Sequence, residues 1–138
     1  MPLTHLSVPA HLSPAQIRAL ADAVHDSLVE TCGVAPNNRF QLVSTYTSQM
    51  MFIDPTYGDV NRTPDGSIIE ILLLEGRTAE QKKNLFRRIA ERAAGAGFSG
   101  DDVMIALTEN ALANWSLGRG RAYGDHHREM TARPASLR

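Results

Sequence analysis

Pro2, directly after Met1, is the residue of this sequence whose possible chemistry is most distinctive. If Met1 is removed, Pro2 becomes a free secondary amine, which can act as a base, as an acid or as an iminium-forming nucleophile. Burial or a nearby cation lowers the pKa of such an amine and leaves more of the neutral base at pH 7. The alternative interpretation is that proline is merely tolerated at the start of a strand, where its missing N–H matters least.

Arg77 is the candidate for binding an acid. We expect it at the end of a strand, just before a helix N-cap, where a guanidinium can grip a carboxylate with two parallel hydrogen bonds. The alternative is a solvated arginine beside Glu75 and Glu80, as is common near helix starts.

Other classes of site find little support. The serines, Ser44 among them, show no base arrangement typical of a hydrolase, and Asp101-Asp102 are interpreted as turn formers because neighbouring strand residues point to opposite faces. Arg119 and Arg121 lack the spacing of a dinucleotide-binding loop and are interpreted as structural or inter-subunit residues. The five histidines and single cysteine show no metal-ligand pattern, so we expect neither a metal nor another cofactor.

Composition restricts the partners and the compartment. With 14 Lys and Arg against 15 Asp and Glu, the net charge of -1 argues against nucleic acid. No apolar run approaches the roughly 20 residues that span a bilayer. No secretory signal is recognisable, so we expect a cytoplasmic protein that does not bind membranes.

Two helices are predicted with the same start signal. Ser13-Pro14-Ala15-Gln16 and Thr78-Ala79-Glu80-Gln81 each combine a cap residue with a glutamine three positions later. Apolar residues then recur at helical spacing, and glycines stand where each helix should end: Gly33 for the first, Gly95 and Gly97 for the second.

Each helix lies between strand-like segments, 3–8 and 40–46 around the first and 68–74 and 103–108 around the second. Aligning Ser13 with Thr78 also pairs Leu20 with Leu85, which suggests an internal duplication. We therefore predict an α/β (α+β) fold, in which duplicated β-α-β units form a four-stranded, mainly parallel or mixed sheet with two helices on one face. One domain is expected over 1–124, with halves of about 2–47 and 67–124, followed by a polar tail at 125–138.

The other face of this sheet needs a cover. The run 68–74 is nearly all apolar, as in strands buried on both faces, and two helices on one face leave the second face bare. A bare apolar sheet face is too large a patch for a monomer, so we predict an oligomer in which the uncovered faces meet.

Several segments resemble the tautomerase superfamily: the Pro after Met1, the repeated strand-helix-strand unit and LEGRTAEQK at 74–82. Within it, the closer resemblance is to malonate semialdehyde decarboxylases. It is carried by GVAPNNRFQ at 33–41, GDDV at 100–103, EN at 109–110 and NWSLGRGRA at 114–122. The resemblance implies a homotrimer of duplicated β-α-β subunits, with an active site around the N-terminal proline.

The resemblance also implies roles for single residues. Pro2 would be catalytic and Arg77 would bind substrate, together with Asn38, Trp115 and Leu117. Trp115 and Leu117 would form an apolar wall that excludes water from the pocket, or else be buried in a contact between subunits. The decarboxylases have an aspartate where this sequence has Asn38, and a second arginine where it has Glu75. The charge of the side chain therefore differs at both positions.

Three functions follow as hypotheses. The first is an enzyme that interconverts enol and keto forms of a small 2-oxo acid, such as a phenylpyruvate-like compound, since this needs one amine to move the proton and one cation to hold the acid. The second is a malonate semialdehyde decarboxylase, or a hydratase or dehalogenase of small unsaturated acids. The third is a trimeric scaffold without turnover.

Overall fold

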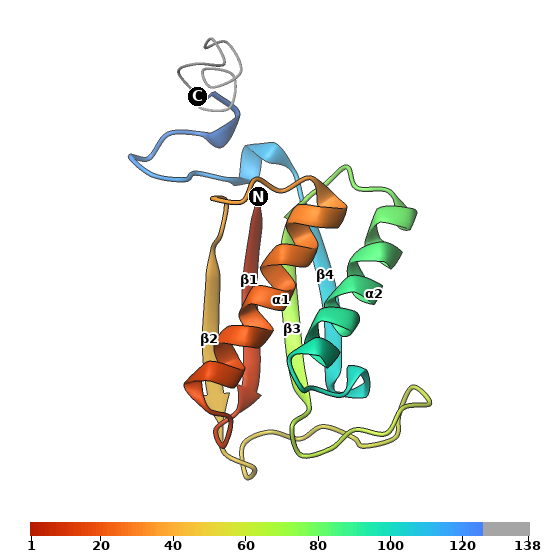
Figure 1. The fold of residues 1–138 in the computed structure, drawn as a ribbon. Helices are drawn as coiled ribbons and strands as arrows, with labels where there is room; N and C mark the ends of the chain where they lie inside the picture. Colours follow the sequence, from red (N-terminus) through yellow and green to blue (C-terminus); the bar gives the residue numbers. More distant parts are fainter. Residues whose placement is uncertain (126–138) are drawn as a thin grey trace.

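The computed structural model describes residues 1–125, which form a four-stranded sheet with two helices on one side (Figure 1). The elements in chain order are β1 (Pro2–Pro9), α1 (Pro14–Cys32), β2 (Gln41–Tyr46), β3 (Ser67–Leu74), α2 (Ala79–Gly95) and β4 (Val103–Asn110), with short 3-10 helices at Gly100–Asp102 and Leu112–Asn114. This is the repeated strand-helix-strand order predicted from the sequence. The predicted polar tail lies outside the described residues, apart from Asp125.

The strands are ordered β2-β1-β3-β4. β1 is parallel to β2 and β3 is parallel to β4, while β1 and β3 run antiparallel in the centre and join the two halves. The register pairs Pro2 with Leu73, and Leu74 with Asn110. The beginning of β1 therefore lies at the same end of the sheet as the ends of β3 and β4.

Both helices begin with the predicted capping box. The Ser13 hydroxyl accepts the Gln16 N–H at 3.1 Å and the Gln16 carboxamide accepts the Ser13 N–H at 2.8 Å. Thr78 and Gln81 repeat this arrangement at 3.1 and 2.9 Å. α1 stops at Gly33, whose φ of 69° lies in the left-handed region that glycine adopts without strain.

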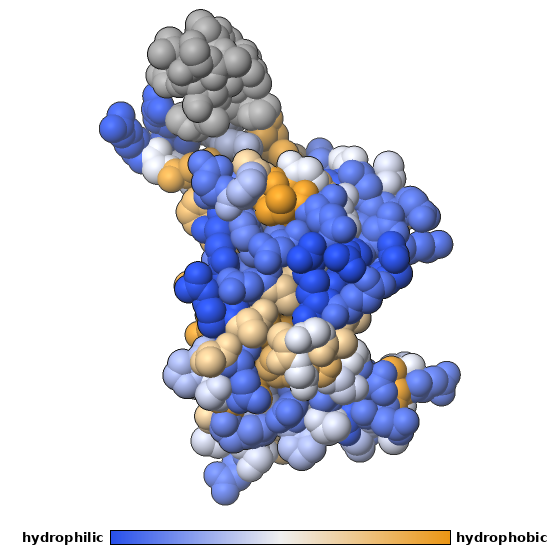
Figure 2. Space-filling model, in the orientation of Figure 1, coloured by the Kyte–Doolittle hydropathy of each residue, from blue (hydrophilic) through white to orange (hydrophobic). Residues whose placement is uncertain are grey.

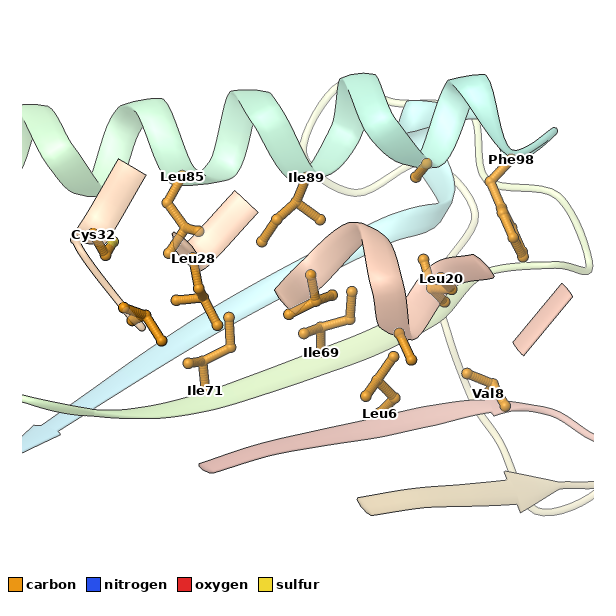
Figure 3. Packing of buried hydrophobic residues seen from close by; sticks show 14 of the residues in the cluster. Leu6, Val8, Leu20, Leu28, Cys32, Ile69, Ile71, Leu85, Ile89 and Phe98 are labelled. Atoms are coloured by element: carbon orange, nitrogen blue, oxygen red, sulfur yellow. The ribbon is translucent and has the colours of Figure 1, made fainter. Parts of the chain in front are cut away.

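The core lies between the sheet and the helices, where alternate strand residues face inward (Figure 3). The inward side chains of β1 and β3 meet the apolar stripes of both helices, and Phe98 lies at one end of the cluster. The labelled members are Leu6, Val8, Leu20, Leu28, Cys32, Ile69, Ile71, Leu85, Ile89 and Phe98. This burial supplies the rigid platform on which the sheet ends are held.

The two faces of the molecule differ in polarity. Figure 2 shows the helix side, which is largely hydrophilic. On the sheet face away from the helices, the chain leaves large apolar side chains exposed, among them Leu42 at 63% and Met104 at 47%. The connection between the halves adds Phe52 at 90%. These residues form the uncovered surface that the sequence predicted.

The connection at 47–66 contains neither helix nor strand. It is held through Asp102, which is buried and accepts the Thr63 N–H at 2.7 Å and the Thr63 hydroxyl at 2.6 Å. Asp101 accepts the Asn61 N–H at 3.1 Å. The two aspartates, interpreted from the sequence as turn formers, thus also anchor the connection between the halves.

Candidate active site

The topology brings the predicted site residues to one end of the sheet. β1 begins at this end, β3, β4 and α1 finish there, and the segment after β4 starts from it (Figure 1). Pro2 begins β1, Arg77 follows β3 and Trp115 follows β4. Asn38 lies in the turn between α1 and β2. Residues far apart in the sequence are therefore gathered by the ends of their elements.

The start of the chain is buried. Pro2 is almost wholly inaccessible to solvent, and Met1 is only 6% exposed, with its carbonyl accepting the Leu74 N–H at 3.2 Å. The pKa of the Met1 α-amino group lies below its usual value, first because burial disfavours the ammonium and second because the Arg77 guanidinium repels it. The Met1 amine, one residue before Pro2, is thus biased toward its neutral form.

Arg77 is half-buried and held by the backbone. Its Nε and Nη2 donate to the Cys32 carbonyl at 3.3 and 3.1 Å, and its Nη1 donates to the Leu74 carbonyl at 3.1 Å. Cys32 ends α1, where the helix dipole favours a cation. Among the described residues these bonds go to carbonyls and not to Glu75 or Glu80. A guanidinium has five N–H groups, so one on each terminal nitrogen remains for a carboxylate.

Asn38 presents an unsatisfied acceptor. Its backbone N–H donates to the Ala35 carbonyl at 2.9 Å, whereas its side-chain Oδ1 is buried without a hydrogen-bond partner among the described residues. The nearby Phe40 carbonyl accepts the Thr4 N–H at 3.0 Å, which ties this turn to the start of β1. A buried acceptor without a donor is energetically costly.

Trp115 and Leu117 lie in a hairpin-like segment after β4. Ser116 bridges to Ala122 in antiparallel fashion, and the Trp115 carbonyl accepts the Tyr123 N–H at 2.8 Å. The half-buried indole of Trp115 donates to Asn110 Oδ1 at 2.5 Å. Leu117 lies further out, 42% exposed, and lines a hollow of about 330 Å³ together with Gly118, Arg119 and Arg121.

The residues that hold Arg77 and Trp115 were not singled out from the sequence. Cys32 and Leu74 act through backbone carbonyls, for which side-chain identity carries no signal. Asn110 is part of a quoted motif, but its contact with Trp115 depends on how the segment after β4 folds back. At the same end of the sheet, Lys82 Nζ lies 2.6 Å from Glu109 Oε1, a pair that joins α2 to β4.

One hydroxyl-imidazole pair corrects the expectation that the serines lack a base. His5 Nε2 lies 2.8 Å from Ser44 Oγ, between β1 and β2. We interpret it as a cross-strand contact, because it lies on the sheet face away from the helices and no carboxylate among residues 1–125 is hydrogen-bonded to His5. In the same residues, no group of three potential ligands gathers to hold a metal ion, and no helix is long and apolar enough to cross a membrane.

Comparison with known sequences gives a consistent result. A family model described as tautomerase enzyme matches residues 38–118. Probable tautomerase YusQ of Bacillus subtilis (strain 168) is 35% identical over 123 residues, which is 88% of this chain and 97% of that relative.

Two solved structures of malonate semialdehyde decarboxylases resemble the chain over nearly its whole length. The FG41 enzyme, inhibited by 3-bromopropiolate, has a TM-score of 0.85 and 36% identity, covering 96% of this chain and 99% of that one. A second, described with both decarboxylase and hydratase activities, has a TM-score of 0.84 and 31% identity, covering 91% and 98%.

Proposed function

The chain belongs to the family of tautomerase enzymes, and from this premise we propose that it catalyses keto-enol tautomerisation of a small 2-oxo acid, with Pro2 as the group that moves the proton. The observation that carries the proposal is the buried start of the chain, where burial and Arg77 together lower the pKa of the Met1 α-amino group, one residue before Pro2. A scaffold has no need of a partly buried amine close to a guanidinium.

The proposed reaction needs two groups. The two remaining N–H groups of Arg77 bind the substrate carboxylate and fix the enol against the start of β1. The neutral secondary amine of Pro2 takes the proton of the enol hydroxyl, and the oxygen electron pair forms the carbonyl while the carbon-carbon double bond opens. The carbon atom then receives a proton from the Pro2 ammonium, which restores the neutral amine.

The surroundings favour a monocarboxylic acid with an apolar group, such as a phenylpyruvate-like compound. Arg77 provides one cation, and the exposed Glu75 two residues before it disfavours a second acidic group. The carboxamide of Asn38 can donate a hydrogen bond to the oxygen that becomes the carbonyl. Trp115 and Leu117 provide apolar surface for an aromatic group.

Decarboxylation of malonate semialdehyde is the second candidate, and hydration or dehalogenation of small unsaturated acids belongs to the same class. The two decarboxylase structures at 36% and 31% identity favour it. Against it stands Asn38, since a carboxamide cannot give or take a proton as the matched aspartate can. Our order of preference therefore rests on the chemistry of that one side chain.

We further propose that the chain acts as a homotrimer. The bare apolar sheet face supports an assembly of several copies, and the number three is what the family resemblance implies. In such an assembly, Leu117 lies on the outer part of its hairpin-like segment and would contact either the substrate or a neighbouring subunit.

The test compares both activities on protein shown by intact mass to begin at Pro2. Ketonisation of enolic 2-oxo acids is followed beside release of carbon dioxide from malonate semialdehyde. Pro2→Ala replaces the secondary amine by a primary one, and we expect it to lower kcat about 100-fold. Pro9→Ala, the same change at the other end of β1, should leave kcat within about twofold.

Three results would overturn the proposal. Carbon dioxide release without ketonisation would place decarboxylation first. Full activity in protein that retains Met1 would reject the amine as the base, because a prolyl peptide nitrogen cannot take a proton. No turnover above background in either the wild type or Pro2→Ala would favour the scaffold.

A further inference from the structure

Asn110, the last residue of β4, contacts two segments of the site through two oxygens. Its backbone carbonyl accepts the Glu75 N–H at 2.9 Å, two residues before Arg77. Its side-chain Oδ1 accepts the indole N–H of Trp115 at 2.5 Å. Asn110 also stands opposite Leu74 in the sheet, and the Leu74 carbonyl accepts the Arg77 Nη1. One residue thus lies between the anchor of the guanidinium and the indole.

The indole bond has a defined direction. An indole nitrogen can only donate, so the amide of Asn110 must present its oxygen rather than its nitrogen. The backbone bonds of Trp115 stay within its own segment, to the Leu112 carbonyl at 3.3 Å and from the Tyr123 N–H at 2.8 Å. Within residues 1–125, the bond to Asn110 is the hydrogen bond that joins Trp115 to the sheet.

We propose that Asn110 is a positioning residue, which fixes the Trp115 indole as the apolar wall of the acid-binding site and sets its place relative to Arg77. This inference rests on the proposed function only in calling the wall a part of the substrate site. Asn110 is not a catalytic residue, because it acts on the substrate through Trp115. Without its acceptor, the indole N–H would turn toward water and the wall would move with it.

The position of the indole can be measured directly, because Trp115 is the sole tryptophan of the chain. Asn110→Leu keeps the approximate size of the side chain and removes the acceptor. Asn110→Asp keeps the acceptor, and Asn114→Leu makes the same change at an exposed asparagine in the same segment. In the ligand-free protein we expect a red-shifted emission and about twofold stronger acrylamide quenching in Asn110→Leu only.

Kinetics test the effect on the substrate. We expect Asn110→Leu to raise KM for an aromatic 2-oxo acid about five- to tenfold, the worth of one hydrogen bond, with kcat within about twofold. Trp115→Phe keeps an aromatic wall but removes the donor, and should raise KM similarly. Because both changes break the same bond, the double variant should be no worse than the poorer single variant.

Each result decides the matter. Wild-type emission, quenching and KM in Asn110→Leu would overturn the positioning role, and so would full additivity of the two single changes. Should Asn110→Leu fail to fold, the emission of Asn110→Asp decides instead, since a red shift with the acceptor retained would contradict the proposal. If no 2-oxo acid is turned over by the wild type, the proposed function fails, while the fluorescence arm still tests the position of Trp115.

Discussion

At the scale of single residues, we propose that Arg77 serves the site through its charge as well as through its N–H groups. Burial and the guanidinium both destabilise an ammonium at the start of the chain, so the pKa of the α-amino group lies below its ordinary value. Pro2 follows directly and is still more buried than Met1. We expect Arg77 to act in the same direction on the amine that removal of Met1 would create, and so to leave a larger fraction of it neutral at pH 7.

This predicts the pH dependence of the reaction. The neutral amine is the active form, so kcat/KM should rise with pH through a pKa below the roughly 8 of an ordinary α-amino group. Arg77→Ala removes the repelling charge and should move the rising limb to higher pH, besides raising KM for acids. Arg77→Lys keeps the charge and should move the limb less. A pH-rate profile of the three proteins checks this, and an unmoved limb in Arg77→Ala would contradict it.

Sequence reasoning singled out candidate site residues but not the contacts that position them. Pro2 and Arg77 stand out because secondary amines and guanidinium groups have distinctive chemistry at any position. The carbonyls of Cys32 and Leu74 could not be found this way, since every residue carries one. Which contacts hold a site residue in place depends on how the chain folds and not on the type of side chain.

At the scale of elements, the helices were predictable because their start signals are local. The capping boxes at Ser13 and Thr78 each involve four consecutive residues, and both formed as expected. The strands were also found. Compared with the prediction, β1 is one residue longer at each end, β2 begins one residue later, β3 begins one residue earlier and β4 ends two residues later. The connection at 47–66 contains neither helix nor strand and is held at Asn61 and Thr63 by Asp101 and Asp102 from the other half.

The anchor of this connection leads to a stability prediction. Asp102→Ala removes the buried acceptor of both the Thr63 N–H and its hydroxyl, and should lower the free energy of unfolding by about 2 kcal/mol. The matched control is Asp101→Ala, whose bond to Asn61 is exposed and should contribute less than about 1 kcal/mol. Urea denaturation of the three proteins measures the difference, and equal losses would show that burial of Asp102 is unimportant.

The two caps allow stability to be separated from function. Ser13→Ala and Thr78→Ala should each cost about 1 kcal/mol, because each removes the acceptor for an N–H in the first turn of a helix. Thr78 adjoins Arg77, whereas Ser13 precedes α1 at the opposite end from Cys32. Only Thr78→Ala should therefore also raise KM for acids. Ser13→Asp keeps a cap acceptor and should retain wild-type stability. Thermal melting and steady-state kinetics are the measurements, and a higher KM in Ser13→Ala would contradict this division.

At the scale of the whole molecule, the single chain leaves the sheet face away from the helices uncovered, as we predicted from the sequence. Helices cover one side of the sheet, and the other side exposes Leu42, Met104 and, from the connection, Phe52. Exposing apolar side chains to water costs about 25 cal/mol of free energy per Å² of accessible apolar area. Association through this face removes that cost.

The last prediction tests this association. Sedimentation should give a species of three 15.1 kDa chains for the wild type, and Leu42→Asp should shift it toward smaller species, because a carboxylate cannot be buried unpaired in an apolar contact. The matched control is Phe86→Asp, a charge placed at an exposed apolar residue on the outer side of α2. We expect the control to remain trimeric. Dissociation of Phe86→Asp with an intact Leu42→Asp assembly would place the contact on the helix side instead, and a monomeric wild type would remove the trimer altogether.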